Sequence, residues 1–186
     1  MSAAPKKQFG LLDPANLPQG VVRLGRLPDP FANDLSEAVI SLFAVEGLFI
    51  CHWQKLIKAD GTIAGVDQFE MPLDGVRWVV TTIEQDFQRK PSEGGLPRDV
   101  FHSNTMIAGE HLSLRWGVSV GGEGVGGYTV NNFDRTEYIL NRESQRFRFT
   151  NDLWHERLHQ LFISIAERHE AGEFKPPPPP ADPAPT

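Results

Sequence analysis

The sequence predicts an α+β protein in which an antiparallel sheet of about five to six strands, built from hairpins, is packed by two to three helices. Strand-like segments follow one another in pairs, and single helical segments separate the pairs. One strand alternates strictly between apolar and polar residues. Hairpins between isolated helices give antiparallel sheets with helices on one face, and an alternating strand has its other face in water.

The chain is expected to fold as a single domain with two extensions. Its 186 residues suffice for one hydrophobic core and are few for two. Residues 1–32 are predicted to form an extended arm that contains prolines, and residues 33–172 the α+β domain. Residues 173–186 are predicted to be a disordered proline-rich tail, because FKPPPPPADPAPT cannot pack a core. No internal repeat is visible.

Residues 33–46 predict the first helix, which Asn33 or Asp34 would open and Gly47 would end. Its apolar residues recur at helical spacing: Leu35, Val39, Leu42 and Phe43. This segment is therefore expected to lie on the sheet with one apolar side.

The best-defined hairpin follows this helix. Residues 48–58, LFICHWQKLIK, are rich in the large apolar and aromatic side chains that favour strands. Asp60-Gly61 accepts the positive φ angles of a tight turn, and residues 62–70 return as the second strand.

A second helix is expected over residues 72–90, before Pro91 ends it. Its apolar positions follow a helical stripe: Val76, Val79, Val80, Ile83 and Phe87. The residues that follow, SEGGLP at 92–97, are predicted to be a loop.

The remaining strands are predicted at residues 100–108, 111–120, 128–140 and 145–149. The second of them alternates, and the third is expected to be interrupted near Asn131-Asn132. The glycine-rich residues 121–127 join two strands and do not match GxxxxGK[ST], so they are interpreted as a hairpin connection and not a phosphate loop. A mobile flap over a site is the alternative.

The C-terminal helix, over residues 151–172, is expected to close the domain. Thr150, Asn151 and Asp152 suit a helix start, and Gly172 suits its end. Its apolar stripe comprises Trp154, Leu158, Leu161, Phe162 and Ile165.

The C-terminal helix contains the one recognisable chemical motif, His155-Glu156-Arg157-Leu158-His159. Residues four apart lie on one side of a helix, so His155 and His159 are candidate zinc ligands and Glu156 a candidate general base. Such a site needs a third protein ligand, which the spacing does not identify. The candidates are Glu170, Glu173, His169, His102, His111 and Glu110.

A structural interpretation of HERLH is preferred to the metal hypothesis. Both histidines lie at the border of the apolar stripe, and Arg157 places a positive charge inside the motif. No longer zinc-protease motif follows. Zinc is therefore expected only under the alternative that the chain is a hydrolase.

The charge of the chain bears on its partners. A net charge of −6 and a pI near 5.5 disfavour a nucleic-acid binder. The densest basic group, Arg142, Arg146 and Arg148, is interpreted as an exposed strand face.

Cysteine content and hydropathy bear on the compartment. Cys51 is the only cysteine, which excludes an intramolecular disulfide, and it is interpreted as a buried structural residue. The N-terminal residues lack the apolar centre of a signal peptide, and no run approaches the ~18 apolar residues of a membrane span. The expectation is a cytoplasmic protein without membrane contact.

Three functions are considered. The preferred one is a non-catalytic binding or assembly protein, such as an adaptor, a chaperone or a subunit of a complex, because proline-rich ends often dock onto other proteins. The second is the zinc-dependent hydrolase. The third is a ligand pocket between sheet and helices lined by tryptophans: Trp53, Trp78, Trp116 and Trp154.

Overall fold

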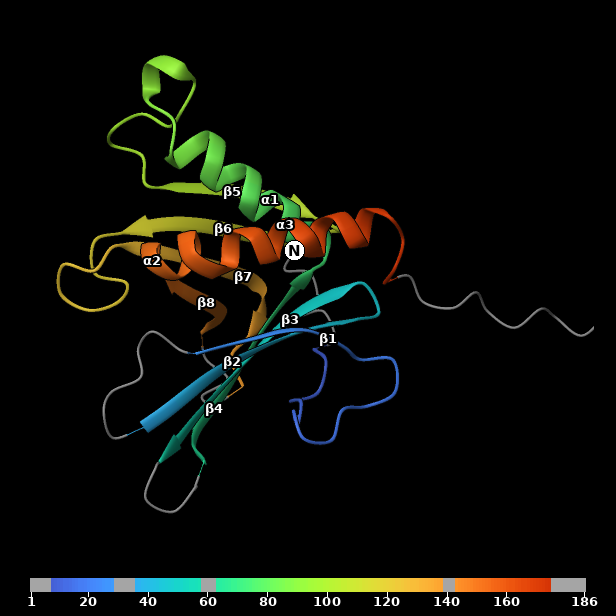
Figure 1. Cartoon of the computed structure of the whole chain (residues 1–186). Helices are drawn as coiled ribbons and strands as arrows, with labels where there is room; N and C mark the ends of the chain where they lie inside the picture. Colours follow the sequence, from blue (N-terminus) through green and yellow to red (C-terminus); the bar gives the residue numbers. More distant parts are fainter. Residues whose placement is uncertain (1–7, 29–35, 58–62, 139–142, 175–186) are drawn as a thin grey trace, which may run out of the picture.

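The computed structural model describes residues 8–28, 36–57, 63–138 and 143–174. The strands form two four-stranded antiparallel sheets, so the prediction of a single sheet of five to six strands was wrong, although the fold is α+β (Figure 1). Sheet A has the order β1-β2-β3-β4 and sheet B the order β5-β6-β7-β8, so strands adjacent in sequence pair with each other.

The two halves of the fold share one order of elements, a four-stranded meander followed by a helical segment. The first half comprises β1 (Val22–Pro28), β2 (Ser36–Val45), β3 (Leu48–Ile57), β4 (Ile63–Pro72), α1 (Asp74–Thr82), the π-helix η1 (Ile83–Phe87) and the 3-10 helix η2 (Pro91–Glu93). The second half comprises β5 (His102–Ile107), β6 (Glu110–Gly117), β7 (Gly127–Thr136), β8 (Ser144–Thr150), α2 (Asn151–Leu153), the π-helix η3 (Trp154–Leu158) and α3 (His159–Glu170).

The helix predicted over residues 33–46 is wrong, because residues 36–45 form strand β2. This strand pairs with β1 on one side and β3 on the other, and both of its faces are buried. Leu42 and Ala44 face the main core, whereas Phe43 and Val45 face a second apolar cluster. A strand that is apolar on both faces cannot be told from a buried helix by its periodicity.

Strand β1 arises within the segment predicted as an extended arm. Residues 22–28 pair with β2, with an irregularity between Arg23 and Gly25. Gly25 lies against helix α3, since a Cβ atom there would come within 2.9 Å of Leu161 Cδ2.

The other predicted elements are confirmed within one to a few residues. The hairpin at residues 48–70 is β3 and β4, although its Asp60-Gly61 turn lies outside the described residues. Strand β7 has a register shift after Asn132, where an interruption was expected. Thr150 caps the C-terminal helix by accepting a hydrogen bond from Leu153 N at 3.1 Å, and Gly172 ends it with a φ of 86°.

One hydrophobic core unites the inner faces of both sheets with the helices. Its members include Leu42, Phe49, Met71, Val79, Leu114, Phe149, Trp154 and Phe162. Helices α1 and α3 pack against each other (Figure 1). The same pair is joined at the surface by an ion pair between Arg77 and Glu170.

No described helix is both long enough and apolar enough to span a lipid bilayer.

The outer face of sheet A is covered by residues 8–21, which we name the covering segment. Leu12 from this segment packs with Phe43, Val45 and Ile50 in the second apolar cluster. Its backbone is also held, because Leu12 N donates to Gln68 Oε1 at 3.0 Å. The segment therefore buries a sheet face that would otherwise present an apolar surface to water.

The two sheets meet at β4, whose outer edge is bonded by side chains instead of by another strand. Glu70 N donates to Gln145 Oε1 at 2.7 Å, and Asn132 Nδ2 donates to Glu70 O at 2.9 Å. The amide groups of β7 and β8 thus satisfy the β4 backbone where a continuous ladder would have extended the sheet. These bonds occupy the edge of β4 at the junction of the two sheets.

Candidate functional site

The HERLH motif lies on the surface, in the π-helix η3 and the first residue of α3. His155 and Glu156 are exposed. His159 is half-buried, with Nε2 2.7 Å from Glu84 Oε1 and its ring 5.2 Å from the Trp154 ring. His159 therefore contacts η1 of the first half and does not point freely into solvent.

The side chains considered as a third ligand have other contacts or lie elsewhere. Glu170 binds Arg77, and Glu173 binds Arg168. His169 contacts Asp74, Glu110 is buried against Arg135, and both His102 and His111 are exposed on sheet B. Among the described residues, no three His, Cys, Asp or Glu side chains are grouped to hold a metal ion.

The metal hypothesis for His155, Glu156 and His159 stays a prediction that metal content can test. For a helix with a structural role, we expect well below one equivalent of zinc by mass spectrometry in protein purified without a histidine tag or chelator. Zinc near one equivalent that is lost both in His155→Ala and in His159→Ala would instead support the hydrolase.

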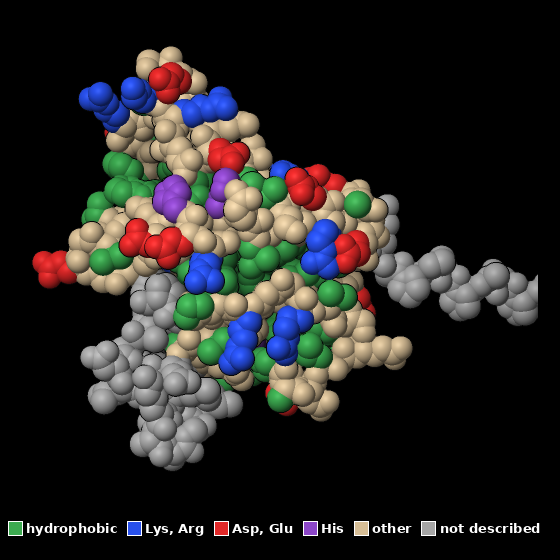
Figure 2. Space-filling model, in the orientation of Figure 1, with side chains coloured by type: hydrophobic (Ala, Val, Ile, Leu, Met, Phe, Trp, Pro, Cys, Tyr) green, Lys and Arg blue, Asp and Glu red, His purple; other side chains and the backbone are tan. Residues whose placement is uncertain are grey.

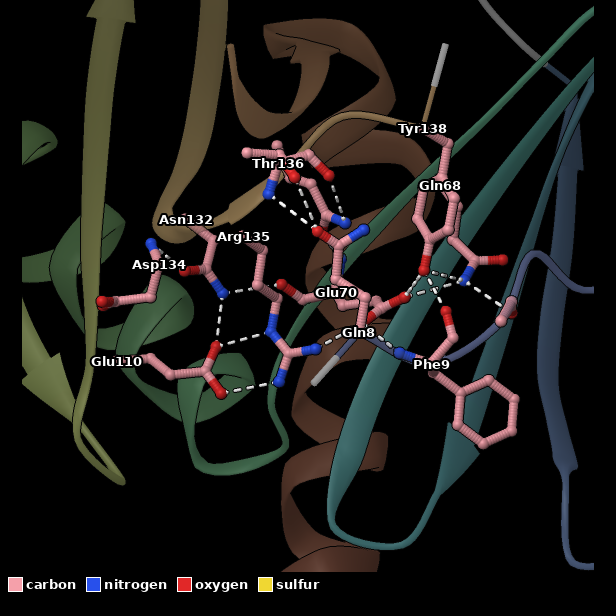
Figure 3. A network of polar contacts seen from close by, with 12 residues as sticks. Gln8, Phe9, Gln68, Glu70, Glu110, Asn132, Asp134, Arg135, Thr136 and Tyr138 are labelled. Atoms are coloured by element: carbon pink, nitrogen blue, oxygen red, sulfur yellow. Dashed lines mark hydrogen bonds and ion pairs between the residues drawn. The ribbon is translucent and has the colours of Figure 1, made fainter. Parts of the chain in front are cut away.

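The most extensive polar cluster lies where β4 meets sheet B, around Arg135 (Figure 3). The Arg135 guanidinium forms ion pairs with two buried carboxylates, Glu70 and Glu110. With Glu110 the pairing is bidentate, at 2.8 Å from Nε and 2.7 Å from Nη2. All three side chains are at most 3% exposed. We name these three residues the buried triad.

Neutral hydrogen-bond donors surround the Glu70 carboxylate of the buried triad. Phe9 N donates to Glu70 Oε2 at 3.0 Å, Gln68 Nε2 donates to Oε1 at 2.9 Å, and the Tyr138 hydroxyl donates to the same oxygen. Burial and the neighbouring Glu70 raise the pKa of Tyr138, so this hydroxyl remains a donor at neutral pH. The buried triad has two carboxylates and one guanidinium, and these hydrogen bonds stabilise its excess negative charge.

The buried triad fits a structural role better than a catalytic one. Two carboxylates and a guanidinium resemble acid–base machinery, yet here the charged groups bind one another and exclude water. The cluster also holds the covering segment, since Phe9 N donates to Glu70 Oε2 and Gln8 Oε1 accepts from Thr136 N. It therefore joins the N-terminal residues, sheet A and sheet B.

Sequence patterns did not reveal the buried triad. Gln68 and Glu70 alternate with Phe69 and Met71, which is also the pattern of a strand with one face in water. The polar side of β4 is instead covered by residues distant in the sequence.

His52 lies on the same covered face, opposite Gln68. Burial lowers the pKa of His52, and its hydrogen bond to Gln68 only partly opposes that effect. The imidazole is therefore neutral at physiological pH. The adjacent Cys51 is buried, as predicted.

The outer face of sheet B is open among the described residues, unlike that of sheet A. Strand register places its side chains in three rows across the sheet. The first row is His102, Arg115, Thr129 and Arg148; the second is Asn104, Ser113, Asn131 and Arg146; the third is Met106 and His111, with Phe133 against the His111 ring. Arginines therefore lie toward one end of this face and apolar side chains at the other.

Two large apolar side chains are exposed at one end of this face. Met106 is 62% exposed and Phe133 is 51% exposed. The His111 ring lies 5.0 Å from the Phe133 ring, and His111 N donates to Asp134 Oδ2 at 2.5 Å. These contacts hold an aromatic side chain on a rigid strand while leaving much of it accessible.

The interpretation of Arg146 and Arg148 as an exposed strand face is confirmed, and Arg142 lies outside the described residues. Arg146 is paired with Glu143.

Met106 and Phe133 did not stand out in the sequence, because single apolar residues on strands usually face a core.

No protein-family model matches the chain, and no curated protein is similar to it in sequence.

Proposed function

We propose that the chain is a non-catalytic binding or assembly protein of the cytoplasm, and that the outer face of sheet B receives a protein partner. The observation that carries this proposal is the exposure of Met106 and Phe133 at one end of a sheet face whose other end carries arginines. Large apolar side chains that a folded surface leaves in water are typical of interaction sites.

The covering segment on sheet A indicates what kind of partner such a face can accept. Residues 8–21 lie across a four-stranded sheet, insert Leu12 among apolar side chains, and bind sheet side chains through backbone groups. Sheet B has the same number and order of strands but no such cover among the described residues. By analogy, its partner is an extended polypeptide segment that brings apolar side chains to Met106 and Phe133.

Charge narrows the class of partner to an acidic segment. Arg115 and Arg148 lie in one row of this face, and Arg146, which is paired with Glu143, lies in the next, whereas the whole chain carries a net charge of −6. Carboxylates beside the arginine row would form charge-assisted hydrogen bonds and accelerate association. Nucleic acid is less favoured, because the rest of the chain would repel a long polyanion.

The test measures the size at which the full chain elutes from a gel-filtration column when a native extract is applied. We expect wild-type protein to elute above its monomer mass of 20.8 kDa, and Met106→Glu/Phe133→Glu to shift to the monomer position. Two such anchors carry enough binding energy for a loss of about 100-fold in affinity. Val118→Glu, which changes a side chain of equal 62% exposure outside this face, should elute as wild type.

A photo-cross-linking residue identifies the partner directly. Placed at Asn104, between the arginine row and the apolar row, it should give an adduct to an acidic protein segment; placed at Ser119 it should not. The proposal fails if wild-type protein elutes as a monomer, or if the adduct from position 104 is a nucleic acid. The alternative function, a zinc-dependent hydrolase, is decided by the metal measurement described above.

A further inference from the structure

A folded loop, residues 88–101, lies over one end of sheet B and projects from the molecule beyond α1 (Figure 1). Its backbone is well bonded: Leu96 N donates to Asp86 O at 2.8 Å, and Gly95 N to Lys90 O at 3.0 Å. A side chain at position 95 is excluded, because a Cβ atom there would lie 2.1 Å from Arg89 O. Loops of this length that keep a defined conformation are often functional.

A cavity of about 290 Å³, which opens to solvent, lies between this loop and the sheet. Four aromatic side chains line it in two contacting pairs. The rings of Phe101 and Trp116 are 6.4 Å apart, and those of Phe87 and Tyr128 are 5.8 Å apart. Phe87 is the last residue of the π-helix η1, and π-helical turns are frequent at functional sites.

The charged side chains that line this cavity have a net charge of +1. Arg89 and Arg98 line it together with a single carboxylate, Asp86, which gives a formal sum of 2 − 1 = +1. Within the described part of the chain, neither guanidinium has an ion pair or hydrogen bond. Figure 2 shows Lys and Arg side chains gathered around the end of the loop, at the top of the view.

We propose that this cavity binds a small aromatic carboxylate, with the ring between the aromatic pairs and the carboxylate on Arg89 and Arg98. An apolar cavity of about 150 Å³ holds one benzene molecule, so 290 Å³ accommodates one ring and a short acidic side chain. A single excess positive charge matches a monoanion better than a phosphate dianion. This site shares no residue with the outer face of sheet B and does not depend on the proposed function.

The test compares 3-phenylpropionate with its neutral isostere 3-phenylpropanamide, by calorimetry and by the indole resonance of Trp116. The full chain should bind the acid and shift that resonance, and it should bind the amide at least about tenfold more weakly, because a charged hydrogen bond contributes roughly 1.5–3 kcal/mol. The indole resonance is assigned with Trp116→Phe.

Variants separate the charge from the aromatic walls. Arg89→Gln/Arg98→Gln should lower affinity for the acid to that for the amide and leave the amide unaffected. Phe101→Ala, at a residue that is 48% exposed, should weaken both ligands about equally. Arg115→Gln is the matched control, because Arg115 is adjacent to Trp116 in sequence but faces the opposite side of the sheet.

The carboxylate has two possible sources, a free small acid or the C-terminus of a polypeptide that ends in an aromatic residue. A peptide ending in phenylalanine with a free carboxylate should bind more tightly than 3-phenylpropionate in the second case, and should fail to bind in the first. Equal affinity for acid and amide, or unchanged affinity for the acid in the double arginine variant, would overturn the proposal.

Discussion

Arg135→Met is expected to destabilise the protein by about 3–5 kcal/mol in urea unfolding at neutral pH, because it leaves two buried carboxylates without their cation. Glu70 and Glu110 are almost fully buried, and the guanidinium binds both. Methionine has a similar length and no charge, so the loss reports electrostatics more than packing.

A second substitution tests this explanation. In Arg135→Met/Glu110→Gln one of the two stranded charges is removed, so the double variant should be more stable than Arg135→Met alone. The exposed pair of Arg77 and Glu170 provides the control, and Arg77→Met should change the unfolding midpoint far less. A small effect of Arg135→Met, equal to that of Arg77→Met, would show that the buried triad does not hold the two sheets together.

Leu12→Ala should cost about 2–5 kcal/mol, as is typical when a buried leucine is truncated in a packed core. Leu12 is 4% exposed and packs on Phe43, Val45 and Ile50, in a cluster separate from the main core. The adjacent Leu11 is 49% exposed, so Leu11→Ala should stay within about 0.5 kcal/mol of wild type.

The readout for this pair is urea unfolding together with limited proteolysis. If the covering segment detaches before the rest of the chain unfolds, Leu12→Ala will be cleaved near residues 8–21 under conditions in which Leu11→Ala is intact. Equal stability and equal cleavage of the two variants would mean that the segment does not cover sheet A in solution.

Most element positions were predictable, because local patterns determine them. The alternation of Leu112, Leu114 and Trp116 with Ser113 and Arg115 reflects the two faces of β6. The helical stripe from Val76 to Phe87 is likewise amphipathic, and one side of it lies on the core. In both cases the apolar residues recur at the period of the element, so the sequence itself indicates which side faces the core.

The prediction failed where both faces of an element are buried. Residues 36–45 read as a helix because Phe43 and Val45 are covered by the N-terminal residues, a contact that no local pattern contains. The division into two sheets has a similar origin. At the junction of the sheets Gln145 and Asn132 bond the β4 backbone, and these contacts join residues more than 60 positions apart.

The candidate site was only partly predictable for the same reason. The sequence singled out HERLH, whose histidines are surface residues of η3 and α3. Trp116 was among the tryptophans considered for a pocket, and it does line a cavity, whereas Trp154 is fully buried in the core. Arg89, Arg98, Met106 and Phe133 acquire meaning only from the neighbours that the fold gives them.

The meander order of the strands has a consequence for how the chain reaches this structure. Each sheet pairs segments that are adjacent in sequence, so little loop-closure entropy opposes its formation. The buried triad joins residues separated by 25 and 65 positions, and the Phe9 contacts span 61 and 129. The sheets can thus form early and dock late. Contacts that form after the folding transition state change the unfolding rate, so the buried triad and the Phe9 contacts determine how slowly the native protein unfolds and not how fast it folds.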